Sequence, residues 1–106
     1  MEDSKGFLEL VGFVYLQQEK LEAAKNIYES LNELFPKTPK ILIALAYISF
    51  QKSEHKQALK WLEEVGGKDA SSFEYPILLL KSKASWHLGK KDTAREFFKR
   101  YLLLKG

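Results

Sequence analysis

An internal repeat of 34 to 36 residues constrains the fold of this chain more than any other feature. Ala24, Ala58 and Ala94 mark it, standing 34 and 36 residues apart. Each alanine follows a large apolar residue, a small residue and a second large residue at the same three offsets, and precedes an aromatic residue or leucine by four positions. A period of this length is typical of repeat proteins, in which each unit stacks only on its neighbours.

The pattern of apolar residues predicts two helices in each unit. Apolar residues recur at spacings of three and four on both sides of a polar break, which is the spacing of a buried helix face. The small residues Gly12, Ala46 and Ser82 would let the first helix of each unit approach the alanine-bearing second helix closely. The sequence therefore predicts an all-α chain with helices over 5–18, 21–35, 39–52, 55–65, 74–88 and 91–104.

Helix boundaries carry local signals of their own. Thr38 followed by Pro39 is typical of an N-cap and a first helical residue. Gly89 suits the left-handed position that follows a helix end. The stretch 66–72 predicts a linker that holds the two extra residues of the third unit, and Pro76 must lie in the first turn of the next helix.

The first unit resembles the tetratricopeptide repeat (TPR), on the residues Leu8, Val11, Gly12, Tyr15, Ala24, Tyr28, Leu31 and Pro36. Departures from the motif are Leu8 and Glu19 in the first unit, Ser49 and Ala70 in the second, and Lys81 and Ser85 in the third. The resemblance implies a right-handed α-solenoid of three helical hairpins. It implies one domain, 1–106, with repeats at about 5–38, 39–72 and 75–106.

A three-unit array of this size is also similar to the small chaperones of bacterial type III secretion. Residues 7–12 and 93–105 resemble the start and the end of the Y-type chaperone. That resemblance implies a client, the secreted X-type subunit, and contact with the export gate. The G-type needle-subunit chaperone is a similar small helical-repeat protein, so both types stay open.

Composition excludes several classes of protein. The 106 residues include no cysteine, which excludes disulfides, thiol catalysis and thiolate metal sites. The longest apolar-rich run, 41–50, is 10 residues, against about 20 for a membrane-spanning helix. Glu2 and Asp3 stand where a secretory signal would carry positive charge. We therefore expect a cytoplasmic protein without membrane insertion.

Catalytic chemistry is also not expected. The two histidines, His55 and His87, lie in different units without a neighbouring ligand at helical spacing. Glu63 and Glu64 point about 100° apart on a helix, and the chain has no glycine-rich phosphate loop. The sequence predicts no enzyme activity, no metal and no cofactor.

The TPR resemblance implies that the first helices line a concave groove. The helix face beside the packing stripe is apolar too, and a helix with two apolar faces needs two things to bury them against. We expect a protein partner to bind there, on Phe13, Leu16, Gln17, Ile43, Tyr47, Phe50, Gln51, Leu79, Lys83 and Trp86. The alternative is that Leu16, Phe50 and Trp86 belong to the core between repeats.

A second candidate surface lies on the last helix, where apolar residues cover most of the circumference. We expect a partner or a second copy of the chain to contact it, or else its end to fray. Its residues are Phe97, Tyr101, Leu102, Leu103 and Leu104.

Charge is uneven along the chain. Residues 1–36 carry three lysines against seven acidic residues, a net −4, and residues 77–106 carry eight basic against two acidic residues, a net +6. These are either solvated faces or a basic end that attracts an acidic protein surface. The basic residues are almost all lysine, which makes nucleic acid a weaker candidate partner.

The sequence thus predicts a non-catalytic binding protein, in its most specific form a type III secretion chaperone that protects apolar client segments. A general TPR adaptor in a cytoplasmic complex is the first alternative, and a nucleic-acid-binding helical repeat is the second. A salt titration separates the last of these, because nucleic-acid affinity falls steeply as salt rises.

Overall fold

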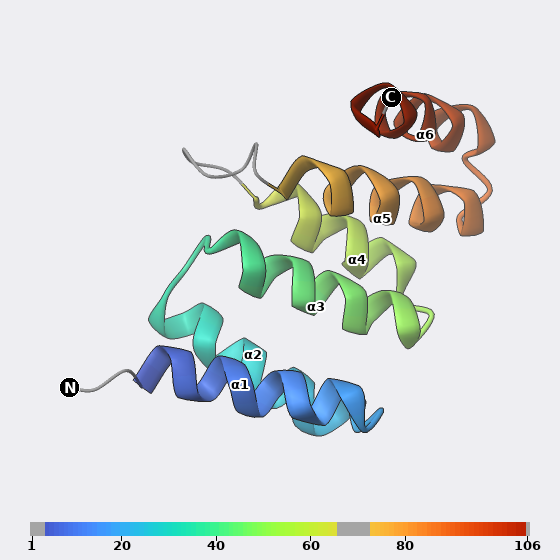
Figure 1. The fold of residues 1–106 in the computed structure, drawn as a ribbon. Helices are drawn as coiled ribbons and strands as arrows, with labels where there is room; N and C mark the ends of the chain where they lie inside the picture. Colours follow the sequence, from blue (N-terminus) through green and yellow to red (C-terminus); the bar gives the residue numbers. More distant parts are fainter. Residues whose placement is uncertain (1–3, 66–72, 106) are drawn as a thin grey trace.

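The computed structural model describes residues 4–65 and 73–105, and these residues form helices and short connections only (Figure 1). Every predicted helix is present, with boundaries within two residues of the prediction. The predicted linker 66–72 lies outside the described residues. The helices are α1 (Ser4–Gln17), α2 (Leu21–Leu34), α3 (Pro39–Gln51), α4 (His55–Glu63), α5 (Glu74–His87) and α6 (Lys91–Lys105).

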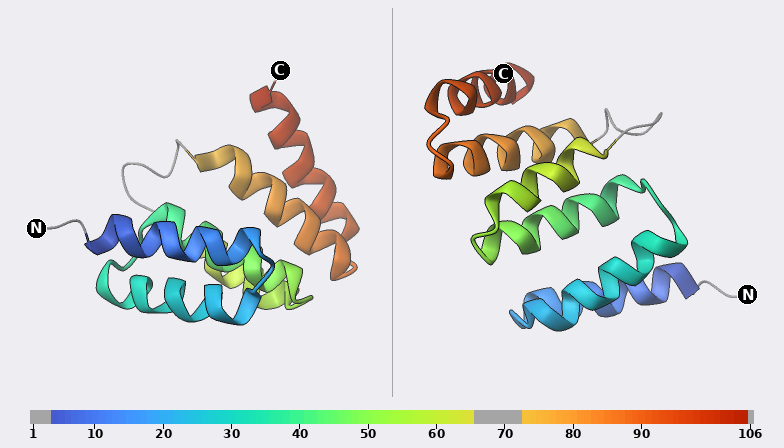
Figure 2. Two further views of the ribbon diagram at one scale, coloured as in Figure 1. Left: turned by 60° about the horizontal axis from the view of Figure 1, so that its bottom comes forward. Right: turned by 180° about the vertical axis from the view of Figure 1, so that it is seen from behind.

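The helices form three stacked hairpins. Within them α1 packs on α2, α3 on α4 and α5 on α6; between them α2 packs on α3 and α4 on α5, and α5 also lies against α3. In Figure 1 the first helices α1, α3 and α5 lie toward the viewer, with α2 and α4 behind them. The two views of Figure 2 show the same order from other directions. The all-helical solenoid of hairpins expected from the repeat is thus confirmed.

Small residues set the distance between the two helices of each hairpin, as predicted. The marker alanines are 0–3% exposed, and Gly12 and Ala46 are buried at the facing positions. A Cβ atom on Gly12 would lie 2.8 Å from Cε2 of Tyr28 and 3.3 Å from Cγ2 of Ile27. Tyr28 is itself buried, and desolvation, followed by the charge of Glu9, raises the pKa of its hydroxyl. Only glycine fits against a tyrosine ring at this distance.

The three first helices end in the same turn. The second residue after each of these helices has a left-handed backbone, with φ of 58° at Glu19, 62° at Ser53 and 81° at Gly89. The next residue in each turn is Lys20, Glu54 or Lys90. Its amide donates to the carbonyl five residues earlier at 2.8–2.9 Å, and its own carbonyl accepts the amide of the unit's marker alanine at 2.9–3.0 Å. This Schellman turn satisfies the end of one helix and starts the next. The prediction for Gly89 is confirmed.

Thr38 occupies the N-cap position of α3, as predicted, and its carbonyl accepts the amides of Ile41 and Leu42. The Thr38 hydroxyl makes no capping bond to α3 but donates to the carbonyl of Phe35 at 2.8 Å. Carbonyls at the end of a helix lack intrahelical partners, and Phe35 follows directly after the last residue of α2. The Thr38 hydroxyl therefore satisfies a free carbonyl at the end of α2. Pro39 is the first residue of α3, as predicted, and Pro76 lies in the first turn of α5.

One ion pair links the first two hairpins. The Lys52 ammonium, just past α3, donates to the Glu22 carboxylate in the first turn of α2. This hydrogen bond lowers the pKa of Glu22 and raises the pKa of Lys52. The Glu22 side chain is exposed and that of Lys52 is partly exposed, so water weakens the attraction and the pair contributes little to stability compared with the apolar contacts.

The unusual Lys81 is accommodated by an aromatic ring. Its ammonium lies 5.5 Å from the centroid of the Phe97 ring on α6. A cation over a ring face is attracted by the π-electrons, and the lysine stem covers apolar surface. A lysine can therefore occupy a position where the other units place Val11 and Leu45.

We predict that Gly12→Ala destabilises the chain by about 1 kcal/mol. Overpacking costs about 1–3 kcal/mol, and the higher helix propensity of alanine offsets about 1 kcal/mol of this cost. The double variant Gly12→Ala/Tyr28→Leu should regain most of this loss. It reproduces the Ala46–Leu62 pairing of the second unit. Urea unfolding followed by circular dichroism measures both, and equal stability of the single variant and the wild type would contradict the close-approach argument.

We also predict that Ser53→Gly stabilises the chain by about 0.5–1 kcal/mol, since a left-handed backbone strains any side chain with a Cβ atom. The reciprocal change, Gly89→Ser, should lower stability by a similar amount. The melting temperatures of the two variants should therefore move in opposite directions. A lower melting temperature for Ser53→Gly would be the contrary result.

Candidate functional site

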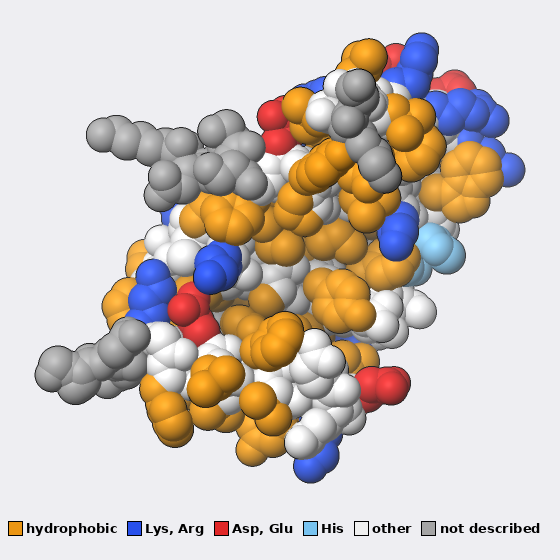
Figure 3. Space-filling view, in the orientation of Figure 1, with side chains coloured by type: hydrophobic (Ala, Val, Ile, Leu, Met, Phe, Trp, Pro, Cys, Tyr) orange, Lys and Arg blue, Asp and Glu red, His pale blue; other side chains and the backbone are white. Residues whose placement is uncertain are grey.

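The face of the first helices carries a row of exposed aromatic rings. Phe13 on α1 is 51% exposed, Tyr47 on α3 is 42% exposed and Trp86 on α5 is 48% exposed. Phe13 and Tyr47 occupy the same repeat position, 34 residues apart, whereas the third unit has Lys83 at that position. Its exposed ring, Trp86, instead occupies the repeat position of Leu16 and Phe50. Figure 3 shows apolar side chains over this face. Gln17, Gln51 and Lys83, from the same predicted set, are also exposed.

Four other members of the predicted set are only partly exposed. Leu16 packs on the core between the first two hairpins, and Ile43 packs on the core between the second and third. Phe50 and Leu79 are half-buried as well. The alternative assignment to inter-repeat core therefore describes Leu16 and Phe50 better than it describes Trp86.

Phe50 is held in a cluster with two histidines from different units. Its ring lies 5.1 Å from His55 and 5.4 Å from His87, edge-on to both, and the two imidazoles stack at 4.7 Å. Sequence reasoning treated these histidines as separate, because 32 positions divide them. The stacking of α5 on α3 and α4 brings them together. No group of three metal-ligating side chains occurs within 4–65 and 73–105. The ring contacts pack Phe50 of α3 against His55 of α4 and His87 of α5.

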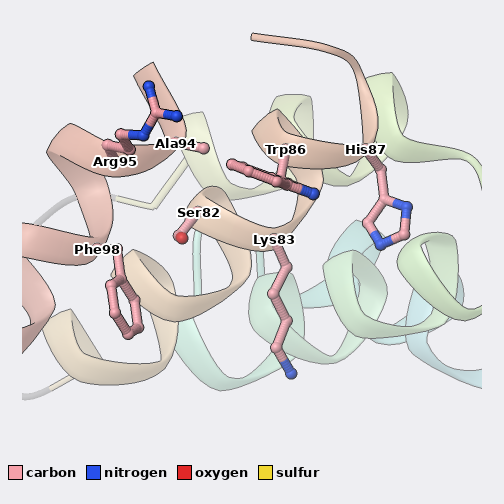
Figure 4. A pocket seen from close by; sticks show the side chains of 7 residues that line it. All are labelled: Ser82, Lys83, Trp86, His87, Ala94, Arg95 and Phe98. Atoms are coloured by element: carbon pink, nitrogen blue, oxygen red, sulfur yellow. The ribbon is translucent and has the colours of Figure 1, made fainter. Parts of the chain in front are cut away.

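A recess of about 250 Å³ opens between α5 and α6 (Figure 4). Ser82 lies between the Trp86 and Phe98 rings in that view. The Lys91 ammonium lies 5.2 Å above the Trp86 ring. The recess thus has an apolar interior and a cationic edge, and its lining residues are Ser82, Lys83, Trp86, His87, Ala94, Arg95 and Phe98.

The second predicted surface, on α6, is divided by the fold. Phe97 and Tyr101 are half-buried, and Tyr101 lies 4.9 Å from Tyr75 of α5 and 5.8 Å from Phe98. Both therefore contribute to the packing of the third hairpin. The exposed part consists of Leu102, Leu103 and Leu104, at 49%, 80% and 51%.

Sequence reasoning missed one apolar surface, on the outer side of α1. Phe7, Leu10 and Val14 are 65%, 59% and 42% exposed. They were assigned no role because the predicted groove occupies a neighbouring stripe. A signal was present: Phe7 stands 34 residues before Ile41 and Val14 stands 34 residues before Ile48, and both isoleucines are buried.

Comparison with known proteins identifies the repeat. One tetratricopeptide repeat model matches residues 15–75, and a second matches residues 75–106. The chain belongs to the tetratricopeptide repeat family. Because these repeats serve in protein–protein interaction, family membership implies a protein-interaction adaptor.

One curated relative is similar to this TPR chain over part of its length. A stretch of 68 residues is 29% identical to an F-box protein of Arabidopsis thaliana, covering 64% of this chain and 19% of the relative. The chain thus spans about a fifth of the length of that relative. In the described ranges, no helix combines the length and the apolar character needed to cross a membrane.

Stability measurements should separate the structural residues of this face from its surface residues. We expect Phe50→Ala to lower the free energy of unfolding by about 2 kcal/mol, because it removes a half-buried ring from the histidine cluster. Tyr47→Ala should change it by less than about 0.5 kcal/mol, because an exposed ring makes few contacts. Chemical unfolding measures both, and equal effects would show that the two rings have the same structural role.

Proposed function

We propose that the TPR face formed by α1, α3 and α5 binds an apolar or amphipathic segment of a partner protein. The supporting observation is the row of exposed rings of Phe13, Tyr47 and Trp86, one from each hairpin. Each fully buried large side chain contributes about 1.5–3 kcal/mol before ordering costs. Gln17 and Gln51 beside the rings would supply hydrogen bonds to the bound segment.

The bound segment would lie across the three hairpins. Its apolar side would cover the three rings, and its polar side would remain in water, as for an amphipathic helix in a groove. Leu16, Ile43 and Leu79 are half-buried between or beside these rings and would form the floor of the contact. The affinity of an apolar contact of this kind should depend little on salt.

The experiment is a selection of displayed helical peptides on the immobilised chain, followed by affinity measurement with the selected peptide. We expect apolar residues at spacings of three and four in the selected sequences. Phe13→Ser/Tyr47→Ser should weaken binding at least tenfold, which is about 1.4 kcal/mol. Both residues are exposed, so the fold should be retained, and circular dichroism checks this.

The control is Leu34→Ser, which removes an equally exposed apolar side chain, 65% exposed, from α2 rather than from a first helix. Its affinity for the selected peptide should equal that of the wild type. Unchanged affinity of the Phe13/Tyr47 variant, or a selected peptide that is released by salt, would contradict the proposal.

The resemblance to type III chaperones suggests a more specific version of this proposal. The client would then be a secreted type III subunit, kept soluble in the cytoplasm and delivered to the export apparatus. The TPR models and the F-box relative support the general adaptor and give no support to this narrower role. Co-expression separates the two, because a chaperone of this class would keep an X-type or needle subunit soluble, whereas a general adaptor would not.

A further inference from the structure

Residues at equivalent repeat positions are more exposed in the third hairpin than in the first two. Tyr28 on α2 is 6% exposed and Leu62 on α4 is 1% exposed, whereas Phe98, at the same position on α6, is 42% exposed. On the first helices, Leu16 and Phe50 are half-buried and Trp86 is 48% exposed. The recess of Figure 4 lies between these two rings.

What covers this surface elsewhere is the next first helix. Ile41 and Ile48 of α3 pack in one cluster with Ala24, Tyr28 and Leu31 of α2. In the same way, Ile77 of α5 packs in one cluster with Ala46 and Leu62 of the second hairpin. The recess beside Phe98 therefore has the shape and chemistry to receive one further amphipathic helix in this register.

The chain presents such a helix at its other end. The residue that stands 34 positions before Ile41 is Phe7, and the residue 34 positions before Ile48 is Val14. The two isoleucines are 0% and 1% exposed, but Phe7 and Val14 are 65% and 42% exposed. The docking face used inside the solenoid thus recurs on α1, where it is uncovered.

We propose that a second copy of this chain docks head to tail, with the outer face of its α1 seated on the α5–α6 recess. The contact continues the stacking geometry of the internal hairpins rather than creating a new one. Charge favours this orientation, since residues 1–36 carry a net −4 and residues 77–106 a net +6. Head-to-head and tail-to-tail contacts would join like charges.

A contact of this kind uses two different faces, and a heterologous contact that continues the stacking of the hairpins extends as an open chain of copies rather than pairing two copies symmetrically. Dimers still carry one free α1 face and one free recess. The average mass should therefore rise continuously with protein concentration, and it should fall when salt screens the attraction between the two ends. Lys83 and Trp86 belong both to the recess and to the groove proposed above. Phe7, Val14 and Phe98 lie outside the groove, so changes at these three residues test the contact between copies separately.

The test uses complementary variants in sedimentation equilibrium. Phe7→Glu/Val14→Glu places carboxylates on the apolar outer face of α1 and should prevent its docking. Phe98→Glu places a carboxylate at the recess and should prevent a partner helix from binding there. Alone, each variant should be monomeric at concentrations where the wild type associates, with affinity weakened at least tenfold. Mixed, they should form a one-to-one dimer and nothing larger, because the Phe98→Glu chain keeps an intact α1 face and the other chain keeps an intact recess.

The control Leu34→Glu changes an exposed leucine of α2 and should associate like the wild type. Circular dichroism checks the fold of every variant. Should the Phe98→Glu chain fail to fold, Arg95→Glu replaces it, because Arg95 is an exposed lining residue of the recess that is not part of the groove. A wild type that stays monomeric into the millimolar range would overturn the proposal. So would a Phe7→Glu/Val14→Glu chain that still dimerises by itself, which would indicate a symmetric contact through α6.

Discussion

The close approach of the two helices in each hairpin is the constraint on which the rest of the structure depends. A small residue on each first helix (Gly12, Ala46 or Ser82) and a buried marker alanine on each second helix bring the helices near enough for large side chains to pack around the contact. Each Schellman turn fixes the angle at which the second helix starts. A hairpin built in this way still has apolar side chains on its flank, so it must stack on another hairpin.

Stacking determines which side chains remain available for partners. The second helices and the flanks of the first helices are used between hairpins, so that one stripe of each first helix stays free, and α1 keeps its outer face free as well. Because this stripe carries Phe13, Tyr47 and Trp86, the free surface is apolar without belonging to the core. The same stacking leaves two unequal ends, an outer α1 face and an α5–α6 recess. One repeat pattern can therefore present apolar surface both along the first helices and at the two ends.

The predictions that succeeded rest on local rules. Helix positions followed from apolar spacing, the turn at Gly89 from the backbone freedom of glycine, and the burial of Ala24, Ala58 and Ala94 from their fixed place in the repeat. The position of Thr38 as N-cap followed from the same rules, but the partner of its hydroxyl did not. A hydroxyl can satisfy either of two adjacent helix ends, and the choice depends on the path of the chain between α2 and α3. The pairing of His55 with His87 was not foreseen, since no short-range pattern connects residues of different units.

The sequence by itself determined the number of helices, their pairing into hairpins and their membership of one repeat class, because these depend on spacings within about 35 residues. Only the tertiary structure decided which apolar residues are covered. Leu16, Phe50 and Trp86 occupy the same repeat position, yet Trp86 is the most exposed of the three because no helix of the described structure packs over it as the following hairpins pack over the other two. The exposed fraction of a side chain depends on its neighbours in space. A repeat motif predicts the same burial at the same position of every unit, although the units differ in which helices pack on them.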